Sequence, residues 1–107
     1  MNEKRIMRIL VMFDLPTLTV EQQRAYRIFR KWLLKDGFVM MQESIYSKLV
    51  LNNNSVKLVI EKIKRNKTKD GIIQVLVLSE KEFNNIEYIV GESTNNVLST
   101  VERVVIL

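Results

Sequence analysis

The sequence predicts an α+β fold, with four strands and two helices in the order strand, helix, strand, strand, helix, strand. Short apolar runs rich in Ile, Val, Leu and Met indicate the strands. Two longer segments repeat apolar residues every three or four positions, which is typical of helices with one buried face. This order is that of a ferredoxin-like domain. We place that domain at residues 1–79 and treat residues 80–107 as a C-terminal extension.

The first strand and the first helix have clear boundaries. The apolar run 5–13 ends abruptly, and its length and this sharp end favour a buried central strand. Pro16 follows closely and cannot continue a strand. Thr19 and Gln22 have the spacing of a capping box and predict a helix over 20–36, with a glycine directly after it. The expected apolar face of this helix consists of Ala25, Ile28, Phe29, Trp32 and Leu33.

Two further strands follow at residues 38–41 and 44–51, separated by a kink or tight turn. In the second of them Ile45, Leu49 and Leu51 alternate with more polar positions. We therefore expect these three side chains in the core, and Tyr46 at the solvent or at an interface.

The remaining elements complete the predicted unit. A polar cluster at 52–55 is rich in helix N-cap residues and precedes an amphipathic helix that ends near residue 66. Residues 72–78 predict another buried strand, and residues 86–90 a weak one.

The chain ends in an apolar run that has no neighbouring strand in the sequence. Such a strand would be stabilised by adding to a sheet edge, in its own chain, in a second copy or in another protein. The residues that we expect to bind a partner in this way are Val104, Val105, Ile106 and Leu107.

The charge is unevenly distributed. The chain has 17 Lys and Arg against 12 Asp and Glu, a net charge of +5. Residues 1–79 hold 15 basic and 7 acidic side chains, and residues 80–107 hold 2 and 5. A basic body favours a polyanionic partner, most often nucleic acid.

Several classes of function are excluded by what the sequence lacks. There is no cysteine and no histidine, which excludes disulfides, thiolate zinc sites and every mechanism based on a histidine. No apolar run is long enough to cross a membrane, and the first residues do not resemble a signal peptide.

Asp14 is the first candidate for chemistry. It comes directly after the predicted central strand, and strand ends in α/β proteins often hold ligands. A role in the turn or in helix entry is the plain alternative. Mg²⁺ is usually held by one or two carboxylates together with waters and phosphates, so a two-fold dimer could supply a second copy of Asp14.

Two basic segments are candidates for binding phosphate. The first predicted helix carries a stripe of Arg24, Arg27, Lys31 and Lys35, with Arg30 beside it. The second segment contains Lys57, Lys62, Lys64, Arg65, Lys67 and Lys69. A solvated helix face is the alternative for the first, and a favourable interaction with the helix dipole is the alternative for the second.

These features together resemble a known family. Phe13-Asp14-Leu15-Pro16 closes the first strand, a basic helix follows, and then come Gly37-Phe38 and Gln42-Glu43-Ser44-Ile45-Tyr46. The combination resembles the CRISPR-associated protein two family, the smaller of two adaptation subunits, and especially its type II form. The resemblance covers the chain from Met7 on, so residues 1–6 look like an extension.

The resemblance implies a ferredoxin-like homodimer. Family members are described as Mg²⁺-dependent endonucleases that act on single-stranded RNA or double-stranded DNA. Asp14 would be the catalytic residue and the ligand of a Mg²⁺ ion shared across the dimer. Phe13 stands where many members have tyrosine. We expect this difference to leave the site with one hydroxyl fewer.

The family is also thought to act in spacer acquisition, in the cytoplasm of prokaryotes and without a membrane partner. The dimer would bridge two dimers of the larger adaptation integrase and hold duplex prespacer DNA for insertion at the repeat DNA of the CRISPR array. The four C-terminal residues would help to grip the integrase. The phosphate contacts would be Arg24, Arg27, Arg30, Lys31, Lys62, Lys64, Arg65, Lys67 and Lys69.

Three functions therefore stay open at this point. The first is an architectural subunit that binds the DNA backbone, and the second is an active metal-dependent nuclease. The third is a ferredoxin-like RNA-binding protein of ribosomal type or a toxin-like ribonuclease. The aromatic signature of RNA-recognition domains is missing, because residues 44–51 contain a single aromatic side chain.

Overall fold

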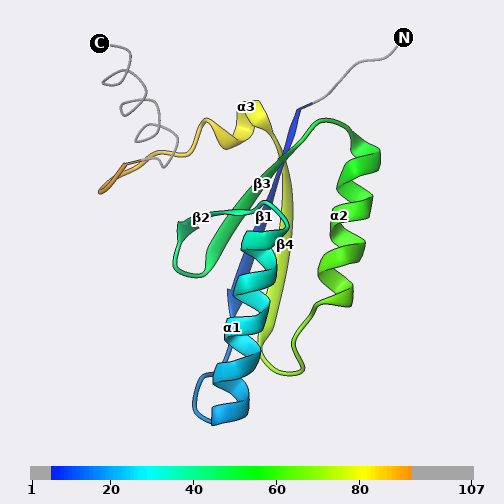
Figure 1. Cartoon of the computed structure of the whole chain (residues 1–107). Coiled ribbons are helices and arrows are strands. Elements are labelled where there is room, and N and C mark those ends of the chain that lie inside the picture. Colours follow the sequence, from blue (N-terminus) through cyan, green and yellow to red (C-terminus); the bar gives the residue numbers. More distant parts are fainter. Residues whose placement is uncertain (1–5, 93–107) are drawn as a thin grey trace, which may run out of the picture.

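The computed structural model describes residues 6–92 and confirms the predicted order of elements. The elements are β1 (Met7–Asp14), α1 (Val20–Lys35), β2 (Val39–Gln42), β3 (Ile45–Val50), α2 (Asn53–Arg65), β4 (Ile72–Ser79) and the short helix α3 (Glu80–Phe83) (Figure 1). The four strands form one antiparallel sheet in the order β2-β3-β1-β4, so β1 is a central strand as predicted.

Local sequence signals explain where the helices begin and end. The Thr19 hydroxyl accepts a hydrogen bond from the Gln22 backbone N–H, and the Gln22 side chain accepts one from the Thr19 N–H. This is the predicted capping box. Asn52 caps α2 in the same way by accepting from the Ser55 N–H. Gly37 has a φ of 100°, which lets the chain leave α1.

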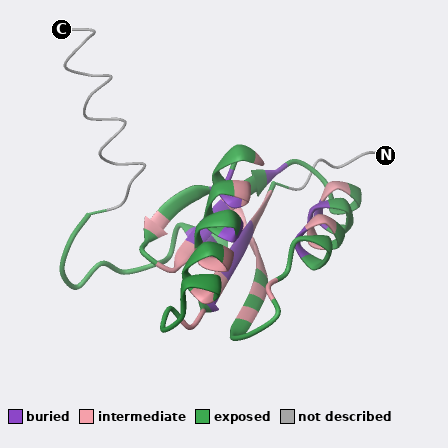
Figure 2. Ribbon diagram, turned by 60° about the horizontal axis from the view of Figure 1, so that its bottom comes forward, coloured by how far each residue is buried: buried purple, intermediate pink, exposed green. Residues whose placement is uncertain are grey.

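One face of the sheet is covered by the two long helices. Ile9, Val11 and Phe13 on β1 pack with Phe29 of α1 and Val59 of α2, in a core of buried side chains. Figure 2 shows the buried residues gathered on the central strands and on the sides of the helices that face them. The pattern follows from the alternation of side chains along a strand, which sends odd-numbered residues of β1 to the helices.

The burial of four side chains differs from expectation. Tyr46 is completely buried, whereas Leu49 and Leu51 are 45% and 54% exposed. The reason is register: Tyr46 is paired with Val11, and both face the helices, so the alternation in β3 is opposite to the one predicted. Ile28 was expected on the buried side of α1 but is 58% exposed.

The end of the described chain also differs from expectation. The strand predicted at residues 72–78 is β4, but it lies at the sheet edge, and its Ile72 and Leu76 are 57% and 46% exposed. Residues 86–90 form no strand in the described chain, so the weak strand predicted there is wrong. Among residues 6–92 no strand is paired with them. The predicted binding residues 104–107 lie outside the described residues.

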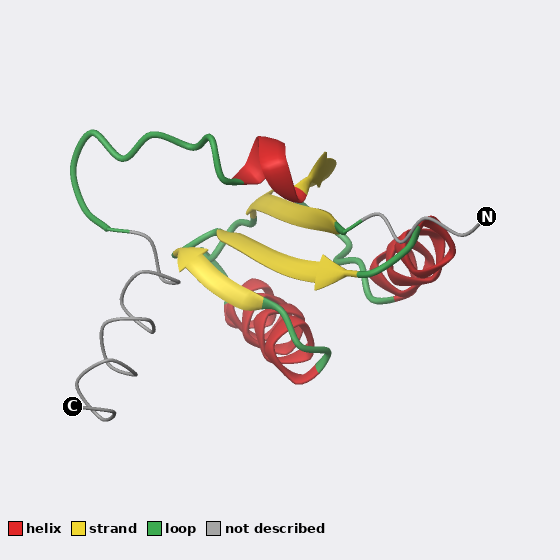
Figure 3. Cartoon of the chain, turned by 90° about the horizontal axis from the view of Figure 1, so that it is seen from above, coloured by secondary structure: helices red, strands yellow, loops and turns green. Residues whose placement is uncertain are grey.

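The second face of the sheet, which we call the open face, meets no long helix within residues 6–92 and mixes buried with exposed side chains: Leu10 and Ser47 are 8% and 2% exposed, whereas Leu49 and Leu76 are 45% and 46% exposed. Leu10 lies opposite Leu76 and Met12 opposite Gln74, and all four point away from α1 and α2. Figure 3 shows α1 on one side of the sheet and α3 on the other. Arg8 holds α3 in place, because its guanidinium donates to both Glu80 carboxylate oxygens at 2.9 and 2.8 Å and lies 4.3 Å from the Phe83 ring centroid.

Candidate metal site and nucleic-acid interface

Asp14 is the last residue of the central strand and lies at the end of the open face. Its side chain is exposed, and no hydrogen bond or ion pair engages it within residues 6–92. An exposed carboxylate without a partner can bind a cation or a polar ligand, since it needs no structural bond to be broken first.

A hollow of about 390 Å³ surrounds Asp14, and oxygen donors from three strands and a turn line it. Glu43 and Ser44 come from the β2–β3 turn, Gln42 from the end of β2, and Gln74 from β4. The Phe13 N–H donates to the Ser44 carbonyl at 3.0 Å, which ties the turn to the end of β1. The arrangement places a second carboxylate, Glu43, beside the same hollow as Asp14.

Sequence reasoning missed Glu43 and Gln74 as members of this site. Glu43 was named in the turn and in the family motif but was given no role in the site, and Gln74 lies far from Asp14 in the sequence. The antiparallel register brings them together, because Met12 is paired with both Ile45 and Gln74. The available signal for Glu43 was its place in the motif Gln42-Glu43-Ser44-Ile45-Tyr46, which was quoted together with the Asp14 motif.

The donor set fits a hard divalent cation. Carboxylate, amide and hydroxyl oxygens are ligands that Mg²⁺ accepts, and it commonly takes one or two carboxylates and completes its shell with waters and phosphates. No group of three or more acidic residues that could hold a metal occurs among residues 6–92. Asp14 and Glu43 would therefore hold the ion only with further oxygen ligands from water, nucleic acid or a second copy of the chain.

Phe13, the residue before Asp14, has its ring in the core. Phe13 is 6% exposed, and its ring packs against Phe29 and Tyr46 with centroid distances of 5.3 and 5.6 Å. It therefore points to the helix-covered face, whereas Asp14 follows on the other side of the strand. The ring belongs to the core.

Gly71 holds the loop between α2 and β4 directly against the Asp14 backbone. Its φ is +94°, and a Cβ atom there would lie 2.7 Å from the Asp14 carbonyl oxygen and 2.8 Å from a Leu15 methyl carbon. A side chain would therefore be both strained and blocked by backbone. The same loop carries two exposed lysines. Lys69 lines a hollow beside Leu15 and Pro16, and Lys67 lines another hollow, with Ile73 and Val75 of β4.

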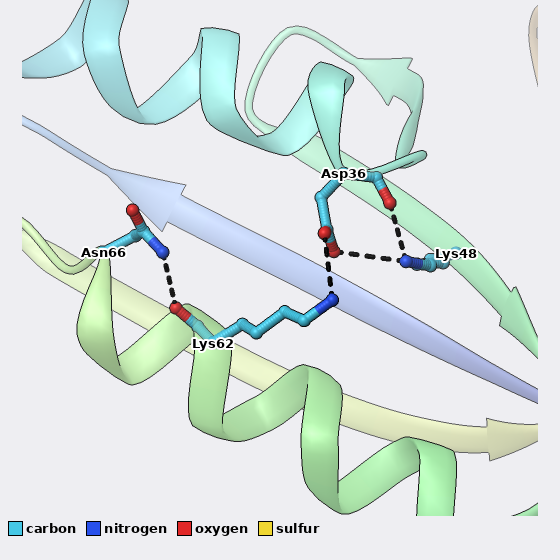
Figure 4. Close-up of polar contacts among 4 residues, drawn as sticks. All are labelled: Asp36, Lys48, Lys62 and Asn66. Atoms are coloured by element: carbon cyan, nitrogen blue, oxygen red, sulfur yellow. Dashed lines mark hydrogen bonds and ion pairs between the residues drawn. The ribbon is translucent and has the colours of Figure 1, made fainter.

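Some of the predicted phosphate-binding cations of the second segment are already in ion pairs with carboxylates. Lys62 Nζ lies 3.3 Å from Asp36 Oδ1, and Lys48 Nζ lies 3.1 Å from Asp36 Oδ2 (Figure 4). Asp36 is thus shared by two lysines at the end of α1 and links α1, β3 and α2. Lys64 makes an exposed pair with Glu61 at 3.5 Å.

Four cations of that segment have no ion pair among residues 6–92: Lys57 near the start of α2, and three at its end and in the loop that follows. Arg65, Lys67 and Lys69 are exposed and have no ion-pair partner in the part of the chain that the structure describes. The same holds for the α1 residues Arg24, Arg27, Arg30 and Lys31. The structure brings Lys69 close to the start of α1, because a hollow beside Leu15 and Pro16 is lined by both.

A family model described as CRISPR associated protein Cas2 matches residues 7–86, which include the central strand, both long helices and β4. The chain belongs to the Cas2 family. This confirms the family inferred from the motifs around Asp14 and Tyr46, and it leaves the ribosomal-type alternative without support.

Individual relatives agree with this membership. The chain is 46% identical to a protein of Treponema denticola over 101 residues, which is 94% of this chain and the full length of the relative. It is 45% identical to a protein of Streptococcus mutans, over 94% of this chain and 93% of that one. Both relatives are named CRISPR-associated endoribonuclease Cas2.

The fold agrees as well. A crystal structure of cas2 superimposes with a TM-score of 0.51 at 16% sequence identity, and the match covers 83% of this chain and 91% of that one. At this identity the likeness supports the fold alone. Within residues 6–92 no helix of this Cas2 family member is long and apolar enough to cross a membrane.

Proposed function

We propose that this chain is the small CRISPR adaptation subunit of a type II system, a homodimer that binds duplex prespacer DNA and bridges dimers of the larger integrase. Membership of the Cas2 family supports this role. The observation that carries the DNA-binding part is a group of exposed cations without ion-pair partners among residues 6–92, at the end of α2 and in the loop before β4.

Arg65, Lys67 and Lys69 are the phosphate contacts that the geometry favours most. They project from the end of α2 and from the loop, they are exposed, and no carboxylate neutralises them within the described residues. Lys62 is a weaker candidate, because binding a phosphate would compete with its ion pair to Asp36. Contacts of this kind read the backbone and not the bases.

The test is duplex binding measured with the integrase subunit present at increasing salt. Each phosphate contact makes the slope of log affinity against log salt more negative by about 0.9, so three contacts in each of the two subunits predict a slope of about −5. The variant Lys67→Gln with Lys69→Gln removes two contacts from each subunit and should make the slope shallower by about 4. The variant Lys57→Gln, in the second turn of α2, is the control. A flat salt response would overturn the proposal.

We propose that the second copy of the chain covers the open sheet face. This face carries exposed aliphatic side chains, among them Leu49, Ile72 and Leu76. Exposed apolar surface of this extent commonly marks an interface. Since Asp14 lies at one end of the same face, a two-fold axis there would bring two copies of the hollow to one interface.

The second candidate function is metal-dependent cleavage of nucleic acid, and the shared hollow of Asp14 and Glu43 favours it. Bound Mg²⁺ would polarise the phosphodiester and lower the pKa of an attacking water. Asp14 would hold the ion, and Glu43, which lines the same hollow, would be a second carboxylate ligand. Cleavage of single-stranded RNA and duplex DNA should be assayed with Mg²⁺ for the wild type and for Asp14→Ala. Equal rates would discard this function.

The C-terminal residues 104–107 are proposed to grip the integrase. Deleting the chain after Gly91 should then weaken assembly with the integrase more than it weakens binding of the isolated dimer to DNA. Pull-down of the integrase and duplex titration of the same truncated protein measure the two effects. The opposite order would show that the tail serves DNA binding.

A further inference from the structure

The outer side of α1 carries a hollow of about 510 Å³ that neither the core nor the Asp14 site uses. Its lining consists of Arg24, Arg27, Ile28, Arg30, Lys31 and Leu34. A single helix is convex, so a hollow on it exists because long side chains stand around shorter ones. Here four long cationic side chains surround two aliphatic ones.

The two aliphatic side chains are exposed without serving the fold. Ile28 is 58% exposed and Leu34 is 42% exposed, and neither belongs to the buried core. Arg24, Ile28, Lys31 and Leu34 follow each other at spacings of three and four residues, so they form a continuous strip along α1. Scattered aliphatic side chains on a surface need no explanation. Ile28 and Leu34 line one hollow together, and we call this pair its apolar floor.

The charge around this floor is of one sign. No carboxylate lines the hollow, and its four cations have no ion-pair partner in the described part of the chain. The acidic residues at the ends of α1 do not compensate them. Asp36 is occupied by Lys48 and Lys62, and Glu21 lies in the first turn beside another hollow.

The combination fits a protein partner better than a duplex. Phosphates require cations only, as the loop with Lys67 and Lys69 supplies them, and a DNA backbone has no aliphatic side chains to fill an apolar floor. A protein segment can provide both an apolar ridge and flanking carboxylates, which is how amphipathic helices occupy grooves.

We infer that the strip on α1 is a docking surface for an acidic amphipathic helix of a partner protein. Aliphatic side chains of that helix bury Ile28 and Leu34, and its Asp or Glu residues pair with Arg24, Arg27, Arg30 and Lys31. These four cations are thereby separated from the proposed DNA contacts at Arg65, Lys67 and Lys69. The dimer then carries two basic surfaces with different partners.

The probe for the test is a synthetic helical peptide in which Leu recurs every three or four residues and Glu flanks it. A second peptide has the same charge but Ser in place of Leu. Fluorescence anisotropy with the full chain should show that the first peptide binds and that the second binds at least about tenfold more weakly. The free energy gained by burying two aliphatic side chains is larger than the ~1.4 kcal/mol that corresponds to a factor of ten in affinity.

The variant Ile28→Ser with Leu34→Ser should lose at least about tenfold in affinity for the Leu peptide and should keep its affinity for duplex DNA. The matched control is Leu58→Ser on α2, where the leucine is 64% exposed outside the hollow. It should change neither. Circular dichroism spectra show that the variants remain folded.

Two results with the peptides would overturn the inference: no binding of the Leu peptide, or equal binding of both peptides. A third would come from DNA binding, if the double variant Arg27→Gln with Lys31→Gln lost as much duplex affinity as the double variant Lys67→Gln with Lys69→Gln. The last result would assign the strip to nucleic acid. Failure of the wild type to bind any duplex, with peptide binding intact, would overturn the proposed DNA binding and leave the docking surface standing.

Discussion

On the helix-covered face of the sheet Val11 and Tyr46 are completely shielded from solvent, whereas on the open face Leu49 and Leu76 are still 45% and 46% exposed. Both faces are built by the same strands and both carry aliphatic side chains. The first face is completed by α1 and α2, and the second meets only the short α3. The hollow with Asp14 and Glu43 opens at the end of the second face. The core that stabilises the fold therefore lies on one side of the sheet, and the candidate site lies on the other.

The largest effect is expected from Phe29→Ala on the covered face. Phe29 is 1% exposed and contacts the Phe13 ring, so its removal leaves a cavity and should cost about 3–5 kcal/mol of the free energy of unfolding. Denaturant unfolding measures this. The neighbouring variant Ile28→Ala, at an exposed position, should change stability by about 0.5 kcal/mol or less. Similar losses at both sites would contradict the assignment of the core.

Leu76→Asp on the open face should leave the fold intact and abolish dimer formation. A carboxylate in the centre of an apolar interface would be buried without a partner, which costs several kcal/mol of association free energy. Sedimentation of the wild type should give a dimer and that of the variant a monomer. Leu58→Asp on α2 is the matched control and should remain dimeric. A dimer that survives Leu76→Asp would show that another surface joins the copies.

Gly71→Ala should disturb the strand end that carries Asp14 at a cost of about 1–3 kcal/mol. The added Cβ would lie 2.7 Å from the Asp14 carbonyl oxygen and would push the loop and the strand end apart. Gly91→Ala is the matched control, because its φ of +96° is similar but nothing lies within 4 Å. Mg²⁺ titration followed by NMR should show weaker binding only in Gly71→Ala. Equal Mg²⁺ affinities in both variants would mean that the loop does not position Asp14.

The contact between Arg8 and Glu80 should make the attachment of α3 depend on pH. The hydrogen bond from Arg8 lowers the pKa of Glu80, and charge attraction from Arg8 acts in the same direction. Because the folded-state pKa is lowered, the stabilisation is present above the ordinary pKa of glutamate and is lost as pH falls through the folded value. The difference in unfolding free energy between wild type and Glu80→Gln should be about 1 kcal/mol near neutral pH. It should shrink in acid, and a constant difference would contradict the contact.

The smallest effect is expected from Tyr46→Phe. The Tyr46 hydroxyl is buried and has no hydrogen-bond partner within the described residues. Its removal should leave stability unchanged or raise it by up to about 1 kcal/mol, because a buried unsatisfied hydroxyl carries a desolvation cost. Thermal unfolding of both proteins measures the change. A clear loss of stability would indicate that the hydroxyl has a partner after all.

Much of the fold could be predicted because its signals are local. The capping box at Thr19, the N-cap at Asn52 and the abrupt end of the first strand depend on residues within a few positions of each other. The candidate site was predictable only at Asp14, since a strand end followed closely by proline is visible in the sequence. Glu43 and Gln74 reach the same hollow through the pairing of β1 with β3 and β4. The spacing of residues within one strand does not show which residues of other strands will be paired with it.

The sequence by itself determined the order of the elements, the caps of the helices, the central position of the first strand and the excess of cations before residue 80. Tertiary structure alone decided which side of β3 is buried, which lysines are neutralised by Asp36, and that Ile28 and Leu34 face solvent among four cations. The physical reason is that helix and turn signals arise between near neighbours. Register, ion pairing and the depth of burial arise between residues that only the folded chain brings together.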